Sequence, residues 1–99
     1  MLEVPGVING LEYPYLLVDC GSPATLIGAD LWEKVKQQQN KLLIEEENFQ
    51  GVTRDNLRVF GLAHLKQEFG SLHREHPVVV VDKIAHKFIL GNDFLVQYR

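Results

Sequence analysis

Short runs of β-forming residues, each closed by a turn residue, constrain the fold of this chain more than any other feature. Residues 4–8 predict a strand, and Asn9-Gly10 after them is the strongest hairpin signal in the sequence, since both residue types adopt positive φ readily. Residues 11–18 predict the returning strand, in which Pro14 favours an edge or a bulge. Repetition of this pattern along the chain predicts an all-β barrel or sandwich.

The remaining elements are expected to be equally short. Further strands are predicted at residues 24–27, 42–44, 49–52, 57–60, 61–66, 72–81 and 88–90. A helix of one or two turns is predicted at residues 30–36, with Trp32 in the core beneath it, and a second helical segment at residues 94–97. No internal boundary interrupts this pattern, so we expect a single domain over residues 1–99.

Composition and charge set the class of protein and of partner. The 99 residues are 45% hydrophobic and 23% charged, as in soluble globular chains. The net charge of −3 argues against nucleic acid as a partner, because such binding needs clustered Lys and Arg. No apolar run approaches the ~20 residues of a membrane helix, and the start of the chain lacks the basic segment of a signal peptide. We therefore expect no membrane partner, and the single cysteine fits a reducing, cytoplasmic location.

Four histidines raise the question of a metal site. His73 and His76 are close in sequence, whereas His64 and His86 lie elsewhere. Zinc needs three or four ligands, and the one cysteine, Cys20, is expected in a turn. We therefore interpret the histidines as solvated surface residues and expect neither a metal nor a cofactor.

Asp19 is the acid that most needs an explanation. It follows three aliphatic residues, Leu16-Leu17-Val18, and precedes Gly21, so its carboxylate stands where a buried strand leaves the core. A turn-capping acid is one interpretation. The second half of the chain has a similar pattern, because residues 88–95 predict an apolar strand followed by a glycine and a short helix.

These two segments resemble the retropepsin-like aspartic proteases of retroviruses and Ty3/gypsy-type retroelements. Residues 16–22 match the family's aliphatic run followed by Asp-[Ser/Thr]-Gly-[Ala/Ser] at every position except Cys20. Residues 89–95, ILGNDFL, match the family's second signature. Between the two the family has a flap, a β-hairpin that folds over substrate, and residues 49–61 occupy that place here. The resemblance implies a closed, mostly antiparallel acid-protease barrel with one or two short helices.

The resemblance also implies an aspartic endopeptidase that needs no cofactor. Two carboxylates that share one proton can activate water and protonate the leaving group, because both cannot ionise at close range. Asp93 is not a second copy of the motif, since Phe-Leu follows it where a glycine turn is required. Asp19 is therefore expected to meet its counterpart at the axis of a homodimer. Gly21 would give the backbone room beside the pair, and the Ser22 hydroxyl could donate to Asp19.

Cys20 departs from the family pattern. Thr or Ser at this place bonds the partner's backbone, and a thiol is a weaker donor, so the link between two chains should be looser. A small buried residue without a role is another interpretation. A cysteine nucleophile is disfavoured, because nothing in the sequence places a histidine beside Cys20.

A peptide substrate would lie extended between the flap and the floor of the site. The expected contact residues are Leu17, Ala24, Ile27, Val52, Thr53, Arg54, Asp55, Asn56, Val79 and Ile84. The resemblance implies a retroelement polyprotein as substrate, in the cytoplasm or within a retroelement particle. Two alternatives stay open: a weak or domesticated copy that serves as a dimerisation or peptide-binding module, and the protease domain of a ubiquitin-shuttle adaptor.

Overall fold

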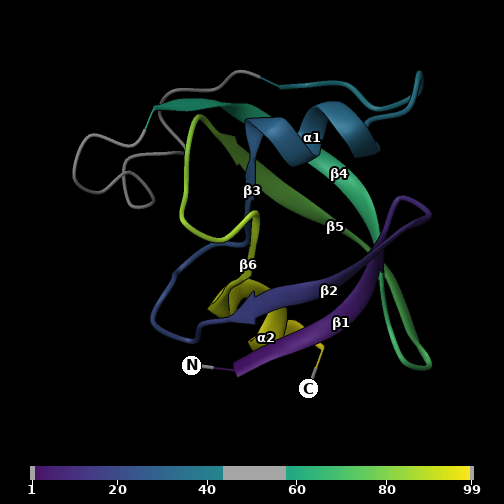
Figure 1. The fold of residues 1–99 in the computed structure, drawn as a ribbon, viewed down its shortest axis with the longest axis vertical. Coiled ribbons are helices and arrows are strands. Elements are labelled where there is room, and N and C mark those ends of the chain that lie inside the picture. The colour runs from purple at the N-terminus through teal and green to yellow at the C-terminus, as the bar shows by residue number, and fades with distance from the viewer. Residues whose placement is uncertain (1, 44–57, 99) are drawn as a thin grey trace.

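The strands form a sheet that closes on itself (Figure 1). The computed structural model describes residues 2–43 and 58–98. Their strands are β1 (Leu2–Ile8), β2 (Leu11–Val18), β3 (Leu26–Gly28), β4 (Val59–Phe69), β5 (Leu72–Val81) and β6 (Phe88–Leu90), and their helices are α1 (Ala29–Val35) and α2 (Asn92–Gln97). The order around the barrel is β1-β2-β6-β3-β5-β4, and β4 pairs with β1 to close it. The predicted closed, mostly antiparallel barrel with two short helices is confirmed.

The first hairpin forms as the sequence predicts. Asn9 has a φ of 49° and Gly10 a φ of 86°, the pair of positive values that a two-residue type I′ turn requires. The register then shifts, because Val4 pairs with Leu16 whereas Gly6 pairs with Tyr13. One extra residue therefore bulges from β2 in the segment that holds Pro14, as expected of a proline inside a strand.

Two parallel pairings bring distant motifs together. β2 runs parallel to β6, with Leu17 opposite Ile89 and Val18 opposite Leu90. β3 is antiparallel to β6 and parallel to β5. Because β2 and β6 point the same way, the chain leaves both strands at one edge of the sheet. The turn that begins at Asp19 and the turn that begins at Gly91 thus lie beside each other.

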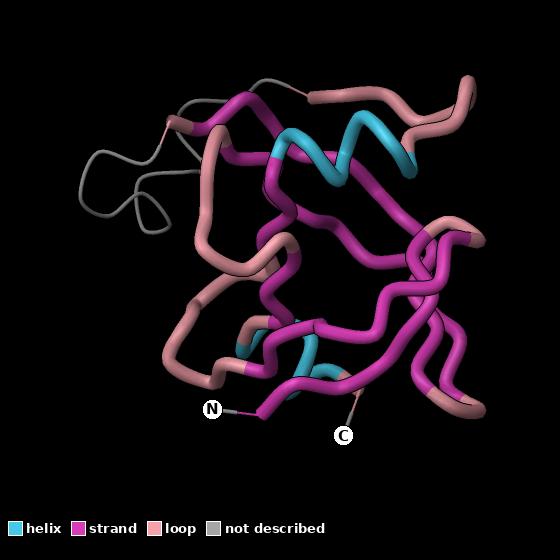
Figure 2. Tube along the Cα trace, in the orientation of Figure 1, coloured by secondary structure: helices cyan, strands magenta, loops and turns pink. Residues whose placement is uncertain are grey.

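The core fills the barrel and extends under both helices. Trp32 is only 7% exposed and packs in this core with Leu31 and Val35, as predicted for the inward side of α1. Phe94 of α2 joins the same cluster. In Figure 2 the two helices lie on opposite sides of the strands.

Several expected elements change their limits. β3 is shifted towards the chain's C-terminus relative to the predicted residues 24–27, and both helices begin earlier than predicted. Of the strand predicted at residues 42–44, Leu43 forms an isolated bridge with Leu62, and residue 44 lies outside the described residues. Residues 49–52 lie outside the described residues, and the strands predicted at 57–60 and 61–66 join in the single strand β4.

The prediction of four solvated histidines is wrong for His76. Its side chain is 3% exposed, although His64 and His73 are exposed as predicted. In β5 alternate residues face the same way, so His76 shares the inward phase of Val78 and Val80, which are fully buried.

Gly91 must be glycine because another backbone touches it. A Cβ built there would lie 2.3 Å from the carbonyl oxygen of Ala24, well inside contact distance. Gly28 is a matched control: it is also buried and precedes a helix, but a Cβ there would lie 3.6 Å from its nearest neighbours.

We expect Gly91→Ala to destabilise the fold by about 1–3 kcal/mol or more, because backbone atoms must move to admit the methyl group. Gly28→Ala should change the free energy of unfolding by less than ~1 kcal/mol, since its methyl group meets ordinary contacts. Urea unfolding of both variants measures the difference. Equal losses would show that the Gly91 contact is softer than the structure indicates.

Candidate functional site

Asp19 lies in a tight turn immediately after β2, on the same side of the barrel as the segment between β5 and β6 (Figure 1). Its backbone N–H donates to the carbonyl of Leu90 at 3.0 Å, which ties it to the end of β6. Its Oδ1 accepts the N–H of Gly21 at 2.9 Å, and its carbonyl accepts the N–H of Ser22 at 3.1 Å. The carboxylate is therefore held by its own turn while remaining partly exposed.

The three residues after Asp19 have different surroundings. A Cβ at Gly21 would lie 3.1 Å from Oδ1 of Asp19, so glycine keeps space beside the carboxylate. Cys20 is exposed and carries a free thiol. The Ser22 hydroxyl donates to the carbonyl of Ala24 at 2.7 Å, and not to Asp19 as the sequence suggested, because the tight turn directs it along its own loop.

The turn after β6 closes against this loop. Asn92 donates its N–H to the carbonyl of Ser22 at 2.7 Å, and Gly91 packs on the backbone of Ala24. The two segments identified as motifs in the sequence therefore form one unit, in which the Asp19 loop packs against the start of α2.

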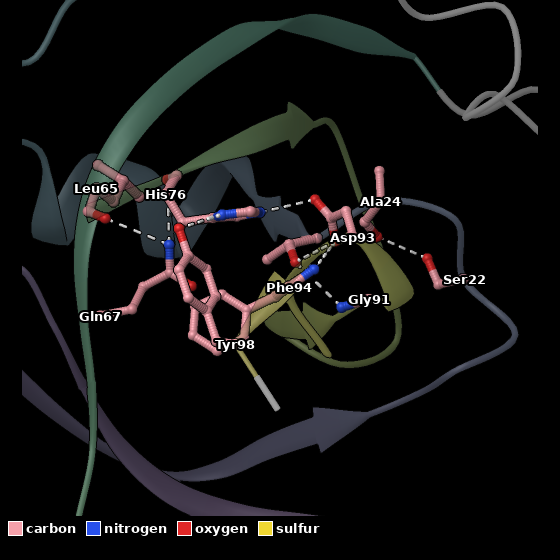
Figure 3. A network of polar contacts seen from close by, with 10 residues as sticks. Ser22, Ala24, Leu65, Gln67, His76, Gly91, Asp93, Phe94 and Tyr98 are labelled. Atoms are coloured by element: carbon pink, nitrogen blue, oxygen red, sulfur yellow. Dashed lines mark hydrogen bonds and ion pairs between the residues drawn. The ribbon is translucent and has the colours of Figure 1, made fainter. Parts of the chain in front are cut away.

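A polar network continues from this unit into the barrel (Figure 3). The Thr25 hydroxyl donates to Oδ1 of Asp93 at 2.8 Å and accepts the N–H of Gly91 at 3.1 Å. The other carboxylate oxygen of Asp93 lies 3.0 Å from Nε2 of His76, whose Nδ1 lies 3.2 Å from the Tyr98 hydroxyl. Thr25 and His76 are buried and Asp93 is partly buried.

The network keeps Asp93 ionised. Burial alone would raise the pKa of this carboxyl, but hydrogen bonds from His76, Thr25 and the Phe94 N–H outweigh that effect and lower the pKa below its usual value. Asp93 is therefore engaged within the chain and does not face Asp19 as a second acid.

Sequence reasoning missed this network, although two signals pointed to it. His76 stands in phase with buried valines of β5, and Asp93 follows the glycine of the second motif. A polar residue at an inward position of a strand needs a hydrogen-bonding partner, and Asp93 is the partner found in the fold.

A small apolar cluster includes Ile89 of β6, the strand that pairs with β2 just before Asp19. It contains Leu26, Val79 and Val81 as buried members, with Ala24, Val59, Leu62, Ile84 and Ile89 packed against them. Ala24, Val79 and Ile84 of this cluster were predicted to contact substrate, whereas Ile89, which pairs with Leu17 of β2, was not among the predicted contacts.

Not all the predicted contact residues join this cluster. Ile27 is fully buried in the larger core, so it offers no surface to a ligand, and Leu17 is 5% exposed. The predicted contacts at Val52, Thr53, Arg54, Asp55 and Asn56 lie outside the described residues.

Within residues 2–43 and 58–98, no three His, Cys, Asp or Glu side chains gather as metal ligands would. In the same part of the chain, neither helix has the length and apolar character needed to cross a membrane.

Comparison with known proteins identifies the fold. No protein-family model matches the sequence, and no curated protein matches it. The retroviral protease-like domain of Ddi1 from Leishmania major superposes with a TM-score of 0.78 at 21% identity, covering 99% of this chain and 77% of that one. EIAV protease, solved with the inhibitor HBY-793, gives a TM-score of 0.74 at 14% identity, covering 97% of this chain and 86% of that one.

These structures agree over nearly the whole chain, while the sequences have diverged widely. The resemblance drawn from residues 16–22 and 89–95 is thus confirmed for the three-dimensional structure. The chain has the retropepsin-like fold.

Proposed function

We propose that this protein is an aspartic endopeptidase that acts as a homodimer, with Asp19 of each copy at the two-fold axis. The observation that carries the proposal is the Asp19 loop in a retropepsin-like barrel: its carboxylate is partly exposed, and its backbone is hydrogen-bonded to the end of β6 and to the turn after it. The described part of the chain holds one such loop, and Asp93 is engaged elsewhere. Two copies are therefore needed to supply two acids.

The proposed reaction needs no cofactor. Of the two Asp19 carboxyls, one is ionised and takes a proton from water as the water oxygen bonds to the peptide carbonyl carbon. The protonated carboxyl supplies the proton that the departing amide nitrogen takes up as the C–N bond breaks. The products are a carboxylic acid and an amine, and the pair again shares one proton.

The substrate would bind in an extended conformation. Main-chain hydrogen bonds would hold it as an added strand, and apolar side chains would contact Ala24 and Ile84, the partly exposed predicted residues of the small cluster. The segment from Val52 to Asn56 is proposed to close over it as a flap. A retroelement polyprotein is the proposed natural substrate, and nucleic acid and membranes are not proposed as partners.

A second function is favoured by one comparison. The Ddi1 domain is a retroviral protease-like domain of a different kind of protein from EIAV protease, and the TM-score with it is 0.78. The chain could therefore serve as the protease or peptide-binding domain of a cellular adaptor. Cleavage of a peptide library, inhibited by pepstatin, would favour an enzyme over a binding module.

We expect Asp19→Asn to abolish hydrolysis while the fold and the dimer persist, because Asn has nearly the same shape but cannot transfer a proton. The loss in kcat/KM should reach at least ~10²-fold, the usual lower range of general acid–base catalysis. Asp30→Asn is the matched control, since Asp30 is 81% exposed and pairs with Lys87 at the surface. Peptidase assays, circular dichroism and sedimentation measure the three properties. Activity above about a hundredth of wild type would remove Asp19 from the mechanism.

Specific activity should fall on dilution, because the acid pair exists only in the dimer. Adding an excess of Asp19→Asn chains to dilute wild type should suppress activity further, since mixed dimers carry one acid. Initial rates over a concentration series, matched with sedimentation at the same concentrations, measure both effects. Undiminished specific activity where the protein is monomeric would contradict a shared site.

Cys20→Ser should tighten the dimer without creating new chemistry. A hydroxyl is a better donor than a thiol, and one improved hydrogen bond from each chain at ~0.5–1.5 kcal/mol amounts to roughly a tenfold change in the dissociation constant. Sedimentation of wild type and variant measures it. If Cys20→Ser abolished activity while Asp19→Asn retained it, the thiol would be the catalyst and the aspartic mechanism would be wrong.

A further inference from the structure

The buried imidazole of His76 has no part in the proposed chemistry, yet it sits at the end of a chain of contacts that leads to Asp19. His76 comes from β5, and its ring reaches Asp93 near the start of α2 (Figure 3). Asp93 in turn accepts the Thr25 hydroxyl, and Thr25 ends the loop that Asp19 begins. The ring is 3% exposed, so solvent does not compete for these bonds.

We infer that His76 is a positioning residue for Asp19: it holds Asp93, and through Asp93 it fixes Thr25 and Gly91, the groups that close the Asp19 loop. The inference rests on the proposed function for its catalytic meaning. Its structural part, that His76 orders this loop, stands on the contacts alone.

The hydrogen bonds form a continuous path from the His76 ring to the Asp19 loop. An ionised carboxylate only accepts hydrogen bonds, so Nε2 of His76 carries the proton that it donates to Oδ2 of Asp93, and the Tyr98 hydroxyl, which can donate or accept, pairs with Nδ1. Oδ1 of Asp93 is then left for the Thr25 hydroxyl and the Phe94 N–H, at 2.8 Å each.

The last step joins the network to the catalytic loop. The Thr25 oxygen accepts the N–H of Gly91, which places Gly91 on the backbone of Ala24. The neighbouring N–H of Asn92 then reaches the carbonyl of Ser22, within the Asp19 turn. Loss of the His76 bond should therefore loosen the amides of Gly91 and Asn92 before it loosens the rest of the barrel.

Packing is the competing role for His76 and has to be separated from hydrogen bonding. Its ring centroid lies 5.1 Å from that of Phe94 and 5.3 Å from that of Tyr98, both with edge contacts. Removing the ring therefore removes aromatic contacts as well as the bond to Asp93.

Two amide variants separate these roles. In His76→Gln the amide nitrogen takes the place of Nε2 and can still donate to Asp93. In His76→Asn the amide is too short to reach Asp93 and lies nearer the place of Nδ1. Both lose the aromatic ring. His73→Gln is the control on the same strand, because His73 is exposed and pairs with Glu68 at the surface.

The first readout is amide hydrogen exchange of the full chain, followed by NMR, which requires no enzymatic activity. In His76→Asn the amides of Gly91 and Asn92 should exchange at least ~10-fold faster, and in His76→Gln less than ~3-fold faster. The amide of Asn9, which donates to Lys66 at the far hairpin, is the internal reference and should change little in either variant. His73→Gln should leave all three amides unchanged.

The second readout compares the change in kcat with the change in KM. A displaced Asp19 should lower kcat about 10-fold in His76→Asn with KM within about 2-fold, and His76→Gln should recover most of kcat. Exchange that rises equally at Asn9, Gly91 and Asn92, or equal effects of Gln and Asn, would overturn the inference in favour of packing. If the amides of Gly91 and Asn92 alone exchanged faster in His76→Asn and the wild-type protein cleaved no peptide, the structural part would stand and the proposed function would be rejected.

Discussion

The contact between the backbones of Gly91 and Ala24 is the constraint on which the rest of the site depends. A Cβ at Gly91 would lie 2.3 Å from the Ala24 carbonyl oxygen, so these two backbone segments pass each other as closely as glycine allows. This approach lets Asn92 bond Ser22 and Leu90 bond Asp19. The backbone of the Asp19 loop is thus held by backbone groups from the far end of the chain, and the carboxylate is held by the N–H of Gly21 in its own turn.

The parallel pairing of β2 with β6 makes that contact possible. Parallel strands deliver their outgoing turns to one edge, and here each strand contributes only a few residues to the pair. β3 and β5 form a second parallel pair, but among the described strands only β2 is followed by an Asp-x-Gly turn of the Asp19 kind. The proposed reaction, which needs two equivalent acids, would therefore draw the second acid from a symmetric copy of the chain.

Much of this arrangement could be predicted from the sequence because local signals were strong. Asn9-Gly10 dictated its turn, Pro14 its bulge, and residues 11–18 and 88–90 their strands. The two motifs indicated which segments would meet. Contacts between residues far apart in sequence were harder to predict, because they depend on which side chains of a long strand face inward. His76 was assigned to the surface with the other histidines because no set of metal ligands was found, whereas its alternation with Val78 places it inside.

The buried polar residues carry the last step of the argument. Thr25, Gln67 and His76 are buried in a barrel whose core is small, and burying such groups costs free energy that hydrogen bonds only partly recover. An apolar side chain at position 76 would extend the row of valines in β5 and add to the core. A network that instead costs stability and ends at the Asp19 loop contributes a fixed geometry, which the proposed reaction would need more than a larger core.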